Sequence, residues 1–172
     1  MGSEMCIRDR DYQRDVAARL ELTDVRRVRP DRAQVLTRDS DGVLHRSDPD
    51  ACCTLRKTEP LERALKGFDA WITGRKRFQG GARTAMEFFE ADADGRIKVN
   101  PLAHWDKADV QDYMLNNRLP RHPLTRDGFA SIGCAPCTSR VKPGEDERAG
   151  RWRGLDKVEC GIHFENGRAV RG

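Results

Sequence analysis

The sequence predicts an α/β fold, in which short strands and helices alternate around one modest core. Two observations support this class. Short apolar runs with strand character, such as 70–73, alternate with stretches whose apolar residues recur at helical spacing, such as 51–65. The chain has 172 residues, of which 37% are hydrophobic and 35% are charged. That composition suits a single domain with a small core.

The expected elements are separated by turn signals. In chain order, they are a surface helix from Asp11, short strands at 25–28 and 34–36, a helix from Ala51 that ends at Gly67, a strand at 70–73, a hairpin of 86–91 and 97–99, and a helix capped by Asp106. The helices are expected because apolar residues, such as Leu61 and Leu65, recur one turn apart. The hairpin is expected because Asp94–Gly95 is a turn dipeptide. The strand at 70–73 is expected to be buried.

Net charge and hydropathy limit the classes of partner. The formal net charge is +4, which fits either weak nucleic-acid binding or a pocket for a small anion. The basic residues gather in 75–83 and 148–153, and this clustering favours the pocket, so we expect no nucleic-acid partner. No apolar run approaches the length of a membrane span, and no secretory signal is visible. We therefore expect a cytoplasmic protein with no membrane partner, in which thiols stay reduced.

Four of the six cysteines form two tight pairs. Cys52 and Cys53 are adjacent, and Cys134 and Cys137 form a CxxC motif. Paired cysteines in a reducing compartment are typical of metal or iron–sulfur sites. Two other interpretations remain open. The cysteines could be two buried side chains and an unrelated CxxC, or they could bind structural zinc, although zinc sites usually contain CxxC twice.

Cys160 differs from the paired cysteines because charged residues surround it. Lys157 and His163 lie three residues away on either side, and nearby cations lower the pKa of a thiol, while Glu159 opposes this effect. The pattern indicates a reactive nucleophile on a mobile tail. A surface cysteine without a chemical role is the alternative.

Basic residues accompany the cysteines and the end of a strand. Arg56 and Lys57 follow the adjacent cysteines by one helical turn, where they would offset the negative charge of bound thiolates. The cluster 75–83 follows a strand end, where α/β folds place their ligands. Arg148 and Arg151 form a further group. Arginine suits phosphate and sulfate, although charge runs are more often solvated faces.

The chain from about residue 11 to 164 resembles the assimilatory adenylyl-sulfate (APS) reductases, which are the iron–sulfur branch of the PAPS reductase family. The stretches that carry the resemblance are DACCTLRKTEPL (50–61), AWITGRKRFQGGAR (70–83), NPLAHW (100–105), LPRHPL (119–124), GFASIGCAPCT (128–138), GEDERAGRW (144–152) and KVECGIH (157–163). The two cysteine pairs separate this branch from the PAPS reductases that lack a cluster.

The resemblance implies an adenine-nucleotide alpha-hydrolase-like layered fold. It implies a [4Fe-4S] cluster whose ligands are Cys52, Cys53, Cys134 and Cys137. It also implies that Cys160 attacks the sulfur of adenosine 5′-phosphosulfate and releases AMP. Thioredoxin would then cleave the enzyme S-sulfocysteine and yield sulfite, in sulfate assimilation toward cysteine. The residues that it implies beside the substrate are Lys57, Arg83, Arg148, Arg151 and His163.

The sequence departs from the family at its beginning. The opening strand and Ser/Gly-rich phosphate loop of the family have no counterpart, and Gln79–Gly80 replaces a QS pair. We therefore expect an N-terminally truncated enzyme with little turnover. Its expected parts are an extraneous leader without periodicity (1–10), the C-terminal portion of the α/β domain with the iron–sulfur site (11–143), and a mobile tail with the catalytic cysteine (144–172).

Two alternative functions remain open. One is reduction of PAPS in place of adenosine 5′-phosphosulfate. The other is an inactive zinc- or cluster-binding fragment that binds nucleic acid through its basic loops. The sequence leaves the oligomeric state open, a homo-oligomer included.

Overall fold

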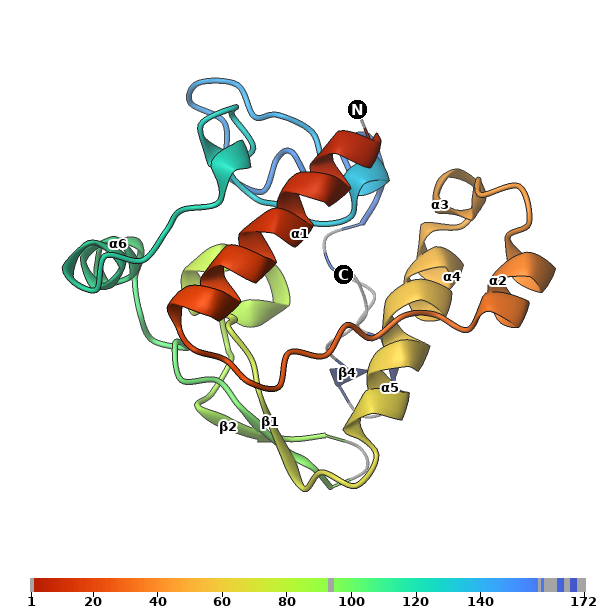
Figure 1. The fold of residues 1–172 in the computed structure, drawn as a ribbon, viewed down its shortest axis with the longest axis horizontal. Helices are drawn as coiled ribbons and strands as arrows, with labels where there is room; N and C mark the ends of the chain where they lie inside the picture. The colour runs from red at the N-terminus through yellow and green to blue at the C-terminus, as the bar shows by residue number, and fades with distance from the viewer. Residues whose placement is uncertain (1, 93–94, 158, 160–163, 166–167, 170–172) are drawn as a thin grey trace. The chain divides into compact units, whose positions relative to one another are not determined.

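The computed structural model describes residues 2–92, 95–157, 159, 164–165 and 168–169. Figure 1 shows the helices and strands in chain order, and the chain divides into two compact units. The first unit contains Met1–Arg27 and Tyr113–Asp156, and the second contains Val28–Asp112 and Lys157–Gly172. None of the helices in the described part of the chain combines the length and the apolar character needed to cross a bilayer.

Helix α1 (Gly2–Arg19) is the longest element of the first unit. It lies against two short 3-10 turns, η4 (Pro123–Thr125) and η5 (Ala135–Cys137). Arg8 Nη1 on this helix lies 2.5 Å from Asp127 Oδ2. The helix begins at Gly2, so residues 2–10 are helical although their sequence shows no periodic apolar pattern. That residues 1–10 are an extraneous leader stays a prediction.

Helix α1 ends in a reversal of the chain. Glu21 adopts a left-handed conformation with φ of 51°. The N–H of Leu22 donates to the carbonyl of Ala17 at 2.9 Å, and the N–H of Glu21 donates to that of Ala18 at 3.2 Å. These two bonds form a Schellman motif, which turns the following segment back along the helix.

The strand expected at 25–28 is not formed. Val25 and Val28 are 43% and 49% exposed, and the segment has no regular secondary structure. A strand needs a partner strand for its backbone groups, and none of the described strands pairs with this segment.

The second unit opens with helices. Their bounds are α2 (Arg32–Arg38), α3 (Leu44–Ser47), α4 (Pro49–Cys53), the π-turn η1 (Thr54–Thr58) and α5 (Glu59–Leu65). The strand expected at 34–36 is wrong, because this segment lies within α2. The side chain of Asp31 accepts a hydrogen bond of 3.0 Å from the N–H of Gln34, so Asp31 caps the helix and starts it.

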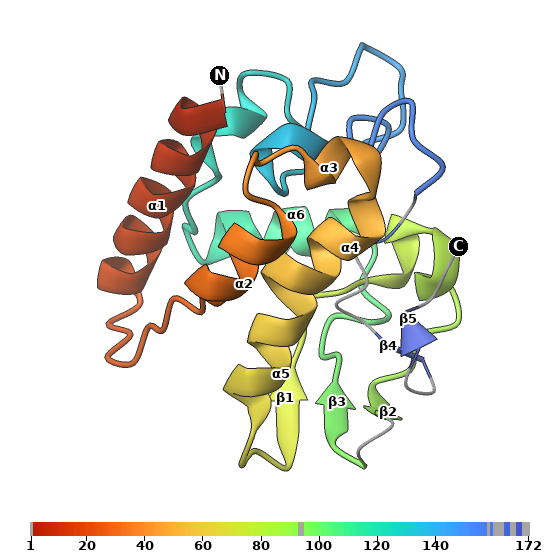
Figure 2. The same ribbon diagram turned by 90° about the vertical axis from the view of Figure 1, so that its right-hand side faces the viewer.

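Helices α4 and α5 form one continuous rod through the π-turn between them (Figure 2). Pro60 explains the π-turn. Proline has no N–H, and its ring would collide with the carbonyl of Arg56 in a regular α-helix. The N–H of Glu59 instead reaches back five residues to the carbonyl of Thr54, which widens the turn just before the proline.

The second unit also contains a three-stranded sheet in the order β1-β3-β2 (Figure 2). Its remaining elements are β1 (Ala70–Ile72), η2 (Arg77–Gln79), η3 (Gly81–Arg83), β2 (Phe89–Ala91), β3 (Ile97–Val99), β4 (Phe164–Glu165) and β5 (Arg168–Ala169), and helix α6 (Lys107–Asn116) continues into the first unit. The expected hairpin is confirmed, since β2 and β3 are antiparallel.

The burial expected for β1 is wrong. Ile72 is 73% exposed, because β1 pairs only with β3 among the described strands and lies at the edge.

A buried amide fixes the loop that follows β1. Asn100 is fully buried, and its Nδ2 donates to the carbonyl of Glu87 at 2.8 Å and to Glu90 Oε2 at 2.9 Å. Thr73 Oγ1 donates to Asn100 Oδ1, and Arg75 Nη2 lies 2.5 Å from the same Glu90 carboxylate. Because these buried polar groups bond to one another, they rigidify the strand ends from which the basic loop departs.

Candidate functional site

The adjacent cysteines lie at the end of α4. Cys53 is buried and Cys52 is half-buried. Arg56 Nη1 lies 3.9 Å from the Sγ of Cys52, one turn further along, as expected from the spacing. Arg56 Nη2 also lies 2.5 Å from Asp39 Oδ2. A hydrogen bond from the backbone N–H of Leu44 holds the pKa of Asp39 below its ordinary value, and the charge of Arg56 acts in the same direction. The ionised Asp39 thereby orients a cation toward the sulfur.

Lys57, which the resemblance implies beside the substrate, lies in the π-turn and is half-buried.

An ion pair joins the C-terminal segment to the helix of this cysteine pair. Lys157 Nζ contacts Oδ1 of Asp50, in the first turn of α4 and two residues before Cys52. The Lys157 side chain is only 8% exposed, whereas that of Asp50 is 70% exposed. The segment that leads to Cys160 therefore starts at the surface of α4.

A second ion pair holds the same segment two residues later. Arg83 Nε donates to Glu159 Oε1 at 2.6 Å, and Arg83 Nη2 donates to Glu159 Oε2 at 2.8 Å. Both side chains are largely buried, with exposures of 12% and 13%. Arg83 Nη1 also donates to the amide oxygen of Gln79. Burial lowers the pKa of the neighbouring Lys76, and the charge of Arg83 lowers it further. Arg83, which the resemblance places at the substrate, thus holds a carboxylate of the chain itself.

Cys160 and His163 lie outside the described residues, and their roles stay predictions.

The second cysteine pair, in the first unit, flanks the 3-10 turn η5. The N–H of Cys137 donates to the carbonyl of Cys134 at 2.9 Å, which closes the CxxC turn. The hydroxyl of Thr138 donates to the same carbonyl at 2.9 Å and accepts from the N–H of Gly133 at 3.1 Å. Both thiols are half-buried. The turn is therefore held by hydrogen bonds on both sides of the motif.

Arg151 packs directly on this turn. A Cβ atom added at Gly133 would lie 2.2 Å from Arg151 Nη2, so the guanidinium occupies the space that a side chain would need. Arg151 Nη1 donates to the carbonyl of Ile132 at 3.3 Å, and its Cζ lies 4.4 Å from the ring centre of Trp152. Trp152 is only 3% exposed, and its backbone N–H donates to the carbonyl of Cys137 at 3.1 Å. Arg151 supports the cysteine turn, a role that its local sequence did not indicate.

Arg148 lies near the same tryptophan, with its Cζ 6.0 Å from the ring centre of Trp152. The predicted substrate residues therefore separate into two groups. Lys57 and Arg83 belong to the second unit, and Arg148 and Arg151 belong to the first.

Sequence reasoning missed Asp50 as a site residue. It forms its ion pair across 107 positions of sequence. No short pattern around Asp50 could have revealed this partner. Gly133 is different: a small residue directly before a CxxC motif is a local signal for close packing.

The cysteines fit a sulfur-ligated metal group in their chemistry. Soft thiolate donors suit iron–sulfur clusters and zinc. Within either unit, the described residues bring no third His, Cys, Asp or Glu side chain to a cysteine pair. Cys52 and Cys53 belong to the second unit, and Cys134 and Cys137 belong to the first.

Comparisons with known proteins identify similar sequences and similar solved structures. The sequence profile of the phosphoadenosine phosphosulfate reductase domain matches residues 9–140. A protein from Mesorhizobium japonicum named adenosine 5′-phosphosulfate reductase is 49% identical over 153 residues, which cover 89% of this chain and 60% of that protein. A Chelativorans protein of the same name is 49% identical, covering 90% of this chain and 62% of that protein. The chain thus spans about 60% of the length of these relatives.

Among solved structures, a phosphoadenylyl-sulfate (PAPS) reductase from Candida auris in a phosphate complex is similar, with a TM-score of 0.58 and 30% sequence identity. The match covers 78% of this chain and 65% of that chain. It confirms the fold class that the sequence resemblance implied.

Proposed function

The chain belongs to the phosphoadenosine phosphosulfate reductase family, and from this premise we propose that it serves in the reduction of adenosine 5′-phosphosulfate to sulfite and AMP. The names of the relatives at 49% identity support this substrate over PAPS. The two cysteine pairs support it as well, since they distinguish the iron–sulfur branch of the family.

One observation carries the proposal: the segment before Cys160 is attached at two points to the elements that carry Cys52 and Arg83. Lys157 pairs with Asp50 on α4, and Glu159 pairs with Arg83. Cys160 follows Glu159 directly in the sequence, and Glu159 is held by the Arg83 guanidinium. We infer that Cys160 works beside this cation, which would suit a nucleophilic thiolate and an anionic substrate.

The reaction that we propose at Cys160 has two steps. In the first, the thiolate attacks the sulfur of adenosine 5′-phosphosulfate, so that a sulfur–sulfur bond forms and the sulfur–oxygen bond to the phosphate breaks. AMP leaves with the electron pair of that bond. In the second, a thiolate of reduced thioredoxin attacks the Sγ of Cys160, and sulfite departs. The second thiol of thioredoxin then resolves the mixed disulfide, which supplies two electrons and restores Cys160.

Through Arg83, binding of the substrate would change the position of the segment that precedes Cys160. The Nε and Nη2 groups of Arg83 bind Glu159, and its Nη1 binds the amide oxygen of Gln79, so both edges of the guanidinium are engaged. The sulfate or phosphate of the substrate would therefore exchange with the Glu159 carboxylate. Lys76, whose pKa is lowered by burial and by Arg83, adds a second donor beside it. The exchange would release the residue next to Cys160 when the substrate is in place.

The four paired cysteines would hold a [4Fe-4S] cluster. When bound, such a cluster ties the four thiolates together and sets the electrostatic field beside the substrate. Arg56 offsets negative charge at Cys52, and Arg151 stabilises the turn that presents Cys134 and Cys137. Structural zinc is the alternative, and it would bring no acid-labile sulfide.

A single-turnover experiment tests the proposal. The anaerobically purified chain is mixed with adenosine 5′-phosphosulfate without thioredoxin, and its peptides are examined by mass spectrometry. We expect one sulfonate group to form slowly on Cys160, in keeping with the little turnover expected of this chain, and to disappear with release of sulfite when reduced thioredoxin is added. PAPS is tested in parallel, and Cys160→Ser is the control. Modification of the Ser variant, or faster modification by PAPS, would contradict the assignment.

A further inference from the structure

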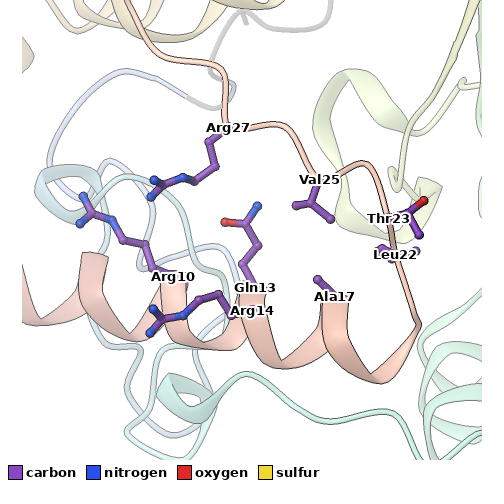
Figure 3. Close-up of a pocket in the computed structure, with 8 residues that line it drawn as sticks. All are labelled: Arg10, Gln13, Arg14, Ala17, Leu22, Thr23, Val25 and Arg27. Atoms are coloured by element: carbon purple, nitrogen blue, oxygen red, sulfur yellow. The ribbon is translucent and has the colours of Figure 1, made fainter.

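A cavity of about 600 Å³ lies in the first unit, between α1 and the segment that folds back along it (Figure 3). Its helical wall consists of Arg10, Gln13, Arg14 and Ala17, whose spacing places them on one face of the helix. Cavities of this size hold small organic molecules.

The opposite wall is formed by the segment after Glu21, where the chain reverses its direction. The left-handed conformation of Glu21 directs Leu22, Thr23, Val25 and Arg27 back over the helix face. Two hydrogen bonds between this turn and the last helical carbonyls fix the direction. The spacing between the walls is thus set by backbone bonds.

The lining contains three arginines and no carboxylate. Arg14 pairs with Asp11, which does not line the cavity. Among the residues that the structure describes, neither Arg10 nor Arg27 forms an ion pair. The nearby Asp24 carboxylate is occupied by Arg26. Within the described part of the chain, the positive charges of Arg10 and Arg27 are therefore not offset by ion pairs.

The cationic and apolar groups occupy different ends of the cavity. Figure 3 shows the guanidinium groups of Arg10, Arg14 and Arg27 gathered at one end, and Leu22 and Val25 at the other. Leu22 and Val25 are 53% and 43% exposed, so both still offer apolar surface to a ligand. Gln13 lies between the two ends and offers an amide to a polar linkage.

We propose that this cavity binds a small organic phosphate or sulfate ester. The ester anion would lie among the guanidinium groups, which match tetrahedral oxyanions by paired N–H donors. The apolar body of the ligand would cover Leu22 and Val25. The proposal uses no residue of the reaction described above and stands apart from it.

Isothermal titration calorimetry with simple probes tests the proposal. The probes are phenyl phosphate, phenyl sulfate, inorganic phosphate and phenol. We expect both esters to bind more tightly than inorganic phosphate, which lacks the apolar body, and than phenol, which lacks the anion. The ester with the higher affinity, phenyl phosphate or phenyl sulfate, identifies the preferred oxyanion. Equal affinity for inorganic phosphate and phenyl phosphate would refute the apolar half of the site.

The double variant Arg10→Ala/Arg27→Ala locates the binding. Charged hydrogen bonds contribute about 1.5–3 kcal/mol each, so ester affinity should fall at least about tenfold. Arg19→Ala is the matched control, because Arg19 is an exposed arginine on the same helix that does not line the cavity. An equal loss in the control would show a general charge effect and overturn the site. Circular dichroism of each variant establishes that the helices are retained.

Discussion

Arg83 and Glu159, separated by 76 positions in the sequence, form a bidentate ion pair with distances of 2.6 and 2.8 Å. The pair anchors the residue next to the proposed nucleophile. In this pair, Glu159 also occupies the Arg83 guanidinium, which the substrate would need. The first two predictions follow from this relationship.

Replacing Glu159 by glutamine should strengthen anion binding at Arg83. The glutamine keeps the shape of the side chain but loses the negative charge that competes for the guanidinium. Loss of one charged hydrogen bond, of about 1.5–3 kcal/mol, predicts at least about tenfold tighter binding of adenosine 5′-phosphosulfate. Calorimetric titration of both proteins measures the change. Glu62→Gln, at an exposed site on α5, is the control and should leave the affinity unchanged. Weaker binding in the Glu159 variant would show that the carboxylate supports the substrate site and does not compete for it.

Replacing Arg83 by alanine should destabilise the chain. The variant leaves the largely buried Glu159 carboxylate without its main partner, and breaking a buried pair in this way costs about 3 kcal/mol. Urea unfolding measures the difference in free energy. Lys157→Met breaks the other tether and leaves only Asp50 without its charged partner, and Asp50 is 70% exposed, so that variant should lose less than about 1 kcal/mol. Equal losses in the two variants would contradict the ranking.

Replacing Gly133 by alanine should disturb the CxxC turn. The added Cβ would lie 2.2 Å from Arg151 Nη2, so the guanidinium must leave its place over the turn. Overpacking of this kind costs about 1–3 kcal/mol, and retention of bound iron should fall as well. Gly74→Ala is the matched control, because no atom lies within 4 Å of the position of its added Cβ. Unfolding curves and iron analysis of both variants test the prediction.

Stability should depend on pH through Glu145. Hydrogen bonds from Arg153 and then from the backbone N–H of Lys142 lower the pKa of Glu145 from 4.5 to about 2. Because the folded chain favours the ionised form, this stabilisation is complete above the unfolded pKa and disappears as the pH falls from 4.5 to about 2. Glu145→Gln should therefore be less stable than the parent at neutral pH, and the gap should close in acid. Unfolding free energies of both proteins across this range measure the gap. A gap that does not change with pH would rule out the ionised pair as its source.

Replacing Cys134 by serine should prevent cluster assembly. Metal–ligand bonds contribute folding free energy, so the variant should also be less stable. Iron and acid-labile sulfide are measured in the anaerobically purified variant and in Cys160→Ser. The Cys160 variant should keep both, because that residue is not assigned as a ligand. Full iron and sulfide in Cys134→Ser would contradict the ligand assignment.

The sequence predicted those elements whose signals are local. The helix through Leu61, the hairpin at Gly95 and the helix capped by Asp106 each depend on neighbouring residues, and all three form. The strand predicted at 34–36 was wrong, because the cap at Asp31 starts a helix that includes this segment.

Distant partners could not be predicted. The ion pair of Asp50 with Lys157 and the packing of Arg151 on Gly133 join residues that no short window contains. The exposure of Ile72 likewise depends on which strands flank β1. For this reason the sequence identified the cysteines and basic residues but not what holds each of them in place.

The π-turn before Pro60 sets the direction in which the cysteine pair points. Each residue in a helix advances the chain by about 100° around the axis, so one extra residue in a single turn rotates everything before it by roughly that angle relative to α5. Deleting one residue between Thr54 and Thr58 would carry Cys52 and Cys53 to another side of the rod with their spacing unchanged. The direction in which Cys52 and Cys53 leave the helix thus depends on Pro60, a residue with no reactive group.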